Sequence, residues 1–196
     1  MTATMKRRDV VNALLEKREG LLVVAGLGST AWDITAAGDS PLNFPLWGAM
    51  GNAAMIGLGL ALAQPRRRVL VITGDGEMLM GLGSLATIGV QRPPNLAVVV
   101  IDNERYGETG MQATHTASGV DLAQVATACG FASAKQIREP GELGPLRTAI
   151  HGAPGPHFAQ IKVVAEKLPL VLPPRDGGIL KLRFRKALVG NGADLD

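Results

Sequence analysis

The sequence predicts an α/β fold in which a mainly parallel central sheet lies between two layers of helices. Short apolar runs that end in Gly, Asp or Asn alternate with segments of helical periodicity, as expected for parallel strands joined by helical crossovers. These runs are apolar at nearly every position, which is typical of strands buried on both faces. The composition agrees, with 46% hydrophobic residues, 25 glycines and 4% aromatic residues among 196.

Each element follows from its own pattern. A helix is expected where apolar residues recur on one helical face, and a strand where a short apolar run is continuous. Asp121 is suited to cap a helix, since its side chain can accept free N–H groups of the first turn. Residues 27–50 contain Gly, Ser and Pro and are expected to be irregular. The predicted helices are 5–18, 51–63, 75 to about 91, 121–130 and about 141–151, and the predicted strands are 21–26, 68–74, 95–102, 133–137 and 157–166.

The chain length predicts one domain with its own core, residues 1–166, followed by an extended tail, residues 167–196. The tail is rich in Pro, Gly and basic residues, but it also carries many apolar side chains. A merely disordered end would carry few of these. We therefore expect the tail to pack on the domain or on a partner.

The formal net charge is +3, and the basic excess lies mainly in residues 6–8, 66–68 and 175–186. Such clusters occur in nucleic-acid-binding proteins and on solvated surfaces. Because Phe184 is the one aromatic residue among them, a solvated surface is the favoured interpretation and no nucleic acid partner is expected. The single cysteine, Cys129, lies in an apolar helical pattern and is expected to be a small packed residue. No run reaches membrane-spanning length, so we expect a cytoplasmic protein without a membrane partner.

Three of the predicted strands end in polar or glycine-rich turns, which begin at Gly26, Gly74 and Asp102. In an open parallel sheet, ligands bind at the carboxyl ends of the strands. The first turn offers backbone N–H groups and the hydroxyls of Ser29 and Thr30, which suit phosphate oxygens.

The other two turns offer ligands for a metal ion. Asp75 supplies a carboxylate and Asn103 an amide oxygen, the hard oxygen ligands that Mg²⁺ or Ca²⁺ prefers. Gly76 would let the backbone come close to a ligand. Residues 77–102 are about one helix plus one strand, so the two strand ends are expected to meet.

This pattern resembles the diphosphate-binding domain of thiamine-diphosphate (ThDP) enzymes, in which Gly-Asp-Gly is followed at a similar distance by Asn-Asn. Here the second pair is Asp102-Asn103, and the position that binds metal in the family is intact. A second stretch, PLWGAMGNAAMIGLGLA (45–61), resembles the family segment that holds the aminopyrimidine of the cofactor. In that segment the carbonyl of Gly48 would accept from the 4′-amino group, and Met50 would be the apolar wedge behind the bent cofactor.

The resemblance implies a role for each matching residue. Metal ligands would be the side chains of Asp75 and Asn103 and the backbone carbonyl of Arg105. Catalytic candidates are Met50, Glu108 and His115, with Thr109 and Gln112 beside them, although His115 is equally compatible with a surface loop. The implied cofactor-binding residues are Gly28, Ser29, Thr30, Gly48, Met50, Gly74, Asp75, Gly76, Glu77, Asn103 and Tyr106.

Residues 102–116 and 170–190 look like the β-chain of the two-subunit sulfopyruvate decarboxylases and of related phosphonopyruvate decarboxylases. The resemblance implies a ThDP- and Mg²⁺-dependent carboxy-lyase that acts on a small anionic 2-oxo acid. It also implies a hetero-oligomer, because an α-type subunit with a pyrimidine domain would supply the activating glutamate. Two alternatives stay open. One is a ThDP-dependent carboligase subunit, and the other is a non-catalytic phosphate- or nucleotide-binding module, which would have no use for the Gly48–Met50 stretch.

Overall fold

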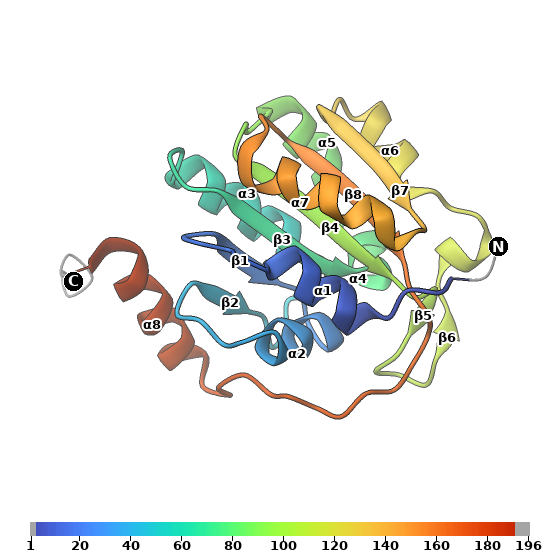
Figure 1. Ribbon diagram of the computed structural model, residues 1–196, viewed down its shortest axis with the longest axis horizontal. Coiled ribbons are helices and arrows are strands. Elements are labelled where there is room, and N and C mark those ends of the chain that lie inside the picture. Colours follow the sequence, from blue (N-terminus) through green and yellow to red (C-terminus); the bar gives the residue numbers. More distant parts are fainter. Residues whose placement is uncertain (1–2, 191–196) are drawn as a thin grey trace.

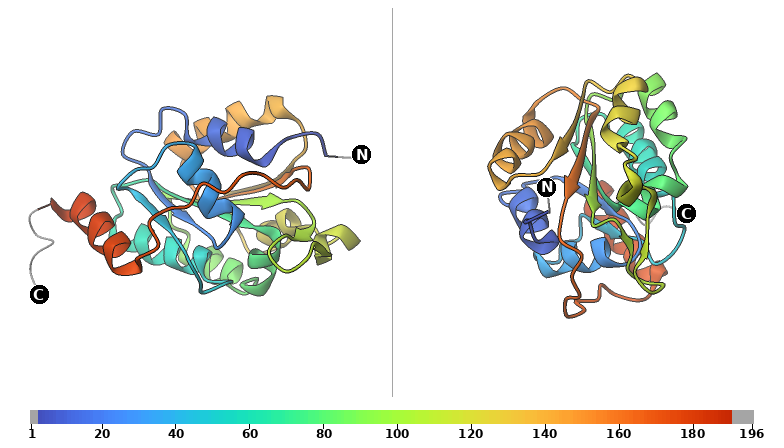
Figure 2. Two further views of the ribbon diagram at one scale, coloured as in Figure 1. Left: turned by 90° about the horizontal axis from the view of Figure 1, so that it is seen from below. Right: turned by 90° about the vertical axis from the view of Figure 1, so that its right-hand side faces the viewer.

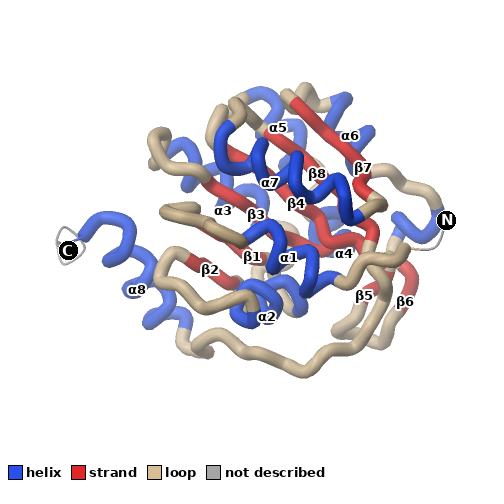
Figure 3. The backbone as a smooth tube through the Cα atoms, viewed as in Figure 1, coloured by secondary structure: helices blue, strands red, loops and turns tan. Residues whose placement is uncertain are grey.

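A six-stranded parallel sheet in the order β2-β1-β3-β4-β8-β7 forms the centre of the computed structural model, which describes residues 3–190 (Figure 1). A separate antiparallel pair, β5 and β6, projects beyond the carboxyl ends of the strands (Figure 3). The predicted parallel α/β fold is therefore confirmed. The strands are β1 Leu22–Ala25, β2 Asn43–Pro45, β3 Val69–Gly74, β4 Leu96–Asp102, β5 Arg105–Tyr106, β6 Gln112–Ala113, β7 Ser133–Ile137 and β8 His157–Lys162.

Helices cover both faces of the sheet, as the mostly apolar central strands β1, β3 and β4 require. On β1, Val23 packs towards one helical layer and Leu22 towards the other, because successive side chains of a strand point to opposite faces. The view along the sheet in Figure 2 shows the two layers on opposite sides. One layer contains α1 Arg7–Leu15, α2 Ser29–Ala36 and α7 Leu143–Gly152, and the other contains α3 Ala53–Ala63, α5 Ser84–Gln91 and α6 Leu122–Ala128.

Within residues 27–166, the predicted helices and strands differ from the structure at several points. Residues 27–50 contain α2 and β2; both elements are short, and Pro45 at the end of β2 fits an edge strand. The helix expected over 75–91 is two helices, α4 Asp75–Met80 and α5, because the chain touches Gly51 at Gly81: a Cβ added there would lie 2.0 Å from the Gly51 carbonyl oxygen. Strand β8 ends at Lys162 rather than at residue 166.

Side-chain hydrogen bonds and short 3₁₀ helices mark the ends of α6 and α7. Asp121 caps α6 as predicted, since its Oδ1 accepts from the backbone N–H of Gln124 at 3.0 Å. Two short 3₁₀ helices, His115–Ser118 and Pro140–Glu142, precede α6 and α7 respectively. Arg68 donates to carbonyl groups at the end of α7, and so joins this helix to the start of β3.

The basic residues 6–8 are also partly engaged within the chain. The buried carboxylate of Asp33 on α2 lies 3.3 Å from Arg7 Nη1 and 3.1 Å from Arg8 Nε. Burial raises the pKa of Asp33, and the two arginine charges oppose this effect. These arginines therefore fasten α1 to α2.

The carboxy-terminal part of the chain is a connector, residues 163–176, followed by helix α8 Gly177–Val189 (Figure 1). The expectation of an extended tail is wrong for α8, which Asp176 caps and which packs on β2 through a ring contact of 5.3 Å between Phe44 and Phe184. The division at residue 166 stays a prediction, and residues 191–196 of the expected tail lie outside the described part. Across residues 3–190, each helix is too short or too polar to cross a membrane.

Candidate functional site

The site lies where the direction of the sheet connections reverses. From β1 the chain crosses to β2 on one side, and from β3 it crosses to β4 on the other, so a crevice opens between the carboxyl ends of β1 and β3. A cavity of about 430 Å³ lies at this place. The predicted site residues that line it are Ser29, Met50, Gly74, Asp75, Gly76, Glu77, Asn103, Arg105, Tyr106 and Glu108.

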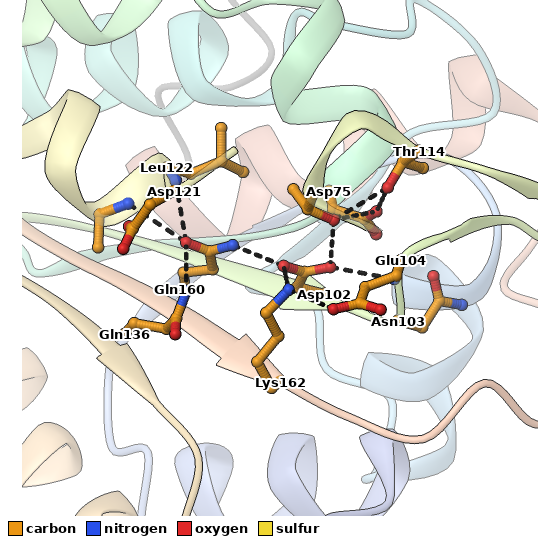
Figure 4. A network of polar contacts seen from close by, with 12 residues as sticks. Asp75, Asp102, Asn103, Glu104, Thr114, Asp121, Leu122, Gln136, Gln160 and Lys162 are labelled. Carbon is orange, nitrogen blue, oxygen red and sulfur yellow. Dashed lines mark hydrogen bonds and ion pairs between the residues drawn. The ribbon is translucent and has the colours of Figure 1, made fainter. Parts of the chain in front are cut away.

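Asp75 is the most deeply placed polar residue of the cavity, with 2% of its surface exposed. Its Oδ2 accepts from Thr114 Oγ1 at 2.5 Å and lies 3.3 Å from Thr116 Oγ1 (Figure 4). Neither threonine holds Oδ1. Burial and the nearby charge of Asp102 raise the pKa of Asp75 to about 6, against the opposing effect of the Thr114 hydrogen bond.

The turn after β4 carries the second group of candidate oxygen ligands. Because Gly74 pairs with Ile101 across β3 and β4, Asp75 and Asn103 follow neighbouring strand ends, as predicted. The backbone N–H of Arg105 donates to Asn103 Oδ1 at 2.9 Å, and Glu104 between them has a φ of +62°, in the left-handed region. This tight turn brings Asn103 and Arg105 to the same cavity as Asp75.

On the opposite wall, the first turn of α2 offers backbone N–H groups. Gly28 precedes the helix with a φ of +79°, and Ser29 lines the cavity. Thr30 does not: its hydroxyl is buried and donates to the Gly26 carbonyl at 2.8 Å, so only its backbone is left for a ligand. The loop of the β5–β6 hairpin, residues 107–111, lies against this turn, since a Cβ on Gly28 would be 3.0 Å from Glu108 Oε1.

Gly76 and Glu77 differ from their expected surroundings. The space beside Gly76 is filled by the ring of Tyr106, which would lie 2.3 Å from an added Cβ, so the glycine is required for this packing. The side chain of Glu77 accepts from Thr73 Oγ1 at 2.8 Å. It also packs against Gly26, where an added Cβ would be 1.7 Å from Glu77 Oε2. Burial raises the pKa of Glu77.

The loop before α3 forms the third wall. Ala49 and Gly51 both have positive φ, +59° and +92°, and Met50 between them points into the cavity. Positive φ at a non-glycine residue is strained and is frequent at functional loops. Gly48 has no heavy atom within 4 Å of an added Cβ, so packing within the described residues does not explain this glycine.

Four predicted residues, Gly28, Thr30, Gly48 and His115, are not among those that line the cavity, and two residues that contact Asp75 were not predicted. His115 is exposed at the start of a 3₁₀ helix and does not line the cavity. Gln112 is exposed and bonds to Thr109, which does line it. Thr114 and Thr116 were missed, although a Thr-x-Thr spacing after a hairpin is the signal that could have placed two hydroxyls together.

The donor set limits what this cavity can bind. A carboxylate, an amide oxygen and backbone carbonyls form a hard-oxygen site for a divalent cation, and a helix start opposite them suits anionic oxygens. The apolar Met50 side of the same cavity suits a flat, less polar group. Together these walls fit an organic phosphate bound through a divalent cation.

Comparison with known proteins agrees with this chemistry. Residues 28–161 match the family described as thiamine pyrophosphate enzyme, C-terminal TPP binding domain. The chain is 42% identical over 159 residues to sulfopyruvate decarboxylase subunit beta of Methanothermobacter thermautotrophicus, an alignment that covers 81% of this chain and 82% of that protein. It is 42% identical over 140 residues to phosphonopyruvate decarboxylase of Streptomyces hygroscopicus, which covers 71% of this chain but 34% of that protein. The fold is similar to benzoylformate decarboxylase of Polynucleobacter necessarius, with a TM-score of 0.70, 19% identity, and coverage of 85% of this chain and 34% of that one.

Proposed function

The chain belongs to the thiamine pyrophosphate enzymes, as their C-terminal TPP-binding domain, and from this we propose that it is the β-type subunit of a heteromeric 2-oxo acid decarboxylase. Relatives named sulfopyruvate decarboxylase subunit beta support this assignment, because the alignment with one of them covers four fifths of both chains. The related phosphonopyruvate decarboxylase supports the same substrate class, a small 2-oxo acid with a second anionic group.

The proposal rests mainly on one observation: Asp75 and residues of the 103–105 turn line the same cavity. In the proposed site, Asp75, Asn103 and the carbonyl of Arg105 would hold Mg²⁺, through which the diphosphate of ThDP would be bound. The N–H groups of Gly28, Ser29 and Thr30, and those of Gly76 and Glu77, would hold the phosphate oxygens, which backbone donors at helix starts do well.

The other end of the cavity would hold the aminopyrimidine. The carbonyl of Gly48 would accept from its amino group, and Met50 would support the ring from below. Met50 also lines a second hollow of about 400 Å³, together with Met55 and Met80. A partner that covers this side of the molecule would bring its glutamate close to the ring.

Helix α3 supports this position of the partner. All its residues are apolar or glycine, although its outer face is exposed, with 38% of Met55 and 51% of Leu62 accessible. A helix that is apolar on every side is normally buried. We therefore place the pyrimidine-domain subunit over the outer face of α3, beside Met50.

When bound, ThDP supplies the electron sink that lets CO₂ leave a 2-oxo acid. The contribution of this chain is to fix the cofactor through the metal site and to line the substrate side. Glu108, on the hairpin loop over the start of α2, is placed to touch substrate or to move a proton there. Because His115 does not line the cavity, it would take part in the reaction only if its segment moved or if the partner subunit lay beside it.

A thermal-melt experiment tests the cofactor assignment. We expect ThDP with Mg²⁺ to stabilise the full chain, Asp75→Ala to abolish the shift, and Asp9→Ala, an exposed aspartate on α1, to leave it unchanged. Absence of a shift in the wild-type chain, even with a pyrimidine-domain subunit present, would contradict the assignment.

The substrate class is tested separately by release of CO₂. The chain, combined with its partner subunit, should decarboxylate sulfopyruvate or phosphonopyruvate in preference to pyruvate. If none of the three loses CO₂ while ThDP still binds, the decarboxylase assignment fails and the cofactor assignment stands.

A further inference from the structure

Asp102 is a fully buried carboxylate in the middle of the polar network, directly before Asn103 (Figure 4). Four donors surround it. The N–H of Glu104 at 3.0 Å and Thr116 Oγ1 at 2.8 Å donate to Oδ1. Gln160 Nε2 at 2.6 Å and Lys162 Nζ at 2.7 Å approach Oδ2. The ThDP-enzyme pattern has Asn at this position, so the chain carries an additional negative charge there.

Lys162 supplies the charge that balances Asp102. It ends β8, and the parallel register of β4 and β8 sets it opposite Asp102. Its side chain is 4% exposed, and its ammonium also contacts Glu104 Oε1 at 2.7 Å. Burial alone lowers the pKa of Lys162, but the bonds to Asp102 and Glu104 outweigh burial, and the pKa lies above its ordinary value. Lysine is almost never buried this far without a partner.

Asp102, which is paired with Lys162, is connected to both groups of proposed metal ligands: the turn of residues 103–105 and Asp75. Through Oδ1, Asp102 holds the N–H of Glu104, the residue in the left-handed conformation between Asn103 and Arg105. Through Thr116 the same oxygen is connected to Asp75, because the Thr116 hydroxyl lies between the two carboxylates. The orientation of Asp102 therefore affects each of the three proposed ligands.

We propose that Lys162, acting through Asp102, is a positioning residue for the Mg²⁺ site, which it preorganises by holding the 102–105 turn and the threonine bridge in place. The inference rests on the proposed function. A pair that only stabilised the fold would affect unfolding and leave the affinity of the folded protein for Mg²⁺ unchanged.

A double-mutant cycle separates these two roles. Lys162→Met leaves Asp102 as an uncompensated buried charge, and we expect the Mg²⁺ dissociation constant, measured by calorimetry on the full chain with saturating ThDP, to rise about tenfold or more. Asp102→Asn removes the charge but brings the Asn amide against the ammonium of Lys162. In Asp102→Asn/Lys162→Met the neutral pair needs no counter-charge, and Mg²⁺ affinity should return to within about threefold of wild type.

The effect of Lys162→Met on Mg²⁺ affinity should change sign with the residue at position 102. Lys162→Met should weaken Mg²⁺ binding in the wild-type chain and strengthen it when Asp102 is already Asn. The comparison of Asp102→Asn with Asp102→Asn/Lys162→Met remains informative even if Lys162→Met alone does not fold. Arg68→Met is the control, since it removes a cation that bonds to α7 carbonyls near the amino end of β3, whereas Asp102 lies at the carboxyl end of β4. It should lower the melting temperature and leave the Mg²⁺ affinity unchanged.

Three results would overturn the inference: Mg²⁺ affinity within twofold of wild type in Lys162→Met, tighter binding in that variant, or no recovery in the double variant. If the wild-type chain binds neither ThDP nor Mg²⁺ even with a pyrimidine-domain subunit present, the proposed function fails as well. The two failures are therefore distinguishable.

Discussion

If Asp75 is a ligand of the proposed Mg²⁺ site, Mg²⁺ binding should weaken as the pH falls through 6, because the carboxyl group would have to lose its proton before binding the ion. Burial, with the charge of Asp102, raises the pKa of Asp75 to about 6 from an ordinary value of 3.8. Such a carboxyl is about nine-tenths ionised at pH 7 and about one-tenth at pH 5. The apparent Mg²⁺ affinity should therefore fall about tenfold over this range, which corresponds to about 1.4 kcal/mol.

The metal-free protein should show the opposite pH dependence in its stability. Because the pKa of Asp75 is higher in the folded than in the unfolded state, the folded state binds the proton more tightly. This contribution is present below pH 4 and is lost as the pH rises to 6, by up to about 3 kcal/mol for two pKa units. Added Mg²⁺ should restore stability above pH 6, where the ionised carboxylate finds its counter-charge.

Calorimetric titration of Mg²⁺ with saturating ThDP, from pH 5 to pH 8, measures how the Mg²⁺ affinity depends on pH. A phosphate group also titrates near pH 6, so the protein contribution needs its own variant. Thr114→Val removes the 2.5 Å hydrogen bond that lowers the pKa of Asp75, and the midpoint of the profile should move to higher pH. Thr148→Val, at an exposed threonine that bonds to Gly144, is the matched control. Equal affinities at pH 5 and pH 7, or a Thr114→Val profile identical to wild type, would refute the reasoning.

Two further predictions concern packing. Gly57→Ala on α3 should destabilise the protein by about 1–3 kcal/mol in urea unfolding, because the new Cβ would lie 2.1 Å from Val71 Cγ2, whereas Gly59→Ala on the same helix meets no atom within 4 Å and should be neutral or slightly stabilising. Equal effects of the two variants would contradict the packing argument. Phe184→Ala should release α8 from β2 at a local cost of about 3 kcal/mol and make residues 163–176 sensitive to limited proteolysis, while Leu182→Ala, at a side chain 58% exposed, should not.

The strands were predictable because each long apolar run had one physical explanation. Runs such as 68–74 and 95–102 are buried on both faces, and β3 and β4 begin and end within one residue of the expected bounds. Elements whose stability comes from tertiary contacts were not visible in the sequence. Strand β2 has three residues and needs β1 as a neighbour, and α2 has no long amphipathic pattern.

Helix α8 was missed for a related reason. Its apolar residues do not follow a single stripe, since Leu180 and Phe184 are buried while Ile179 and Leu182 are exposed. The helix is held by Phe44, which is distant in the sequence. Composition alone therefore favoured an extended segment where the structure has a capped helix.

The candidate site was predictable at its strand ends and not in the surroundings of those ends. That Asp75 and Asn103 meet follows from parallel pairing of adjacent strands, which local patterns already imply. The packing of Gly76 against the Tyr106 ring was not predicted, because this ring comes from a hairpin that the patterns did not predict.

The buried pair of Asp102 and Lys162 shows the limit of motif reasoning most clearly. From the sequence, Asp102 is a departure from Asn-Asn with no visible consequence for the metal site. In the structure, its charge requires a cation, and the one that meets it stands at the end of β8, a strand with no part in the motif. A motif records the residues that touch a ligand, whereas a buried charge also constrains the strands packed beside it. For this reason, the effect of exchanging Asp for Asn at position 102 should depend on the residue at position 162.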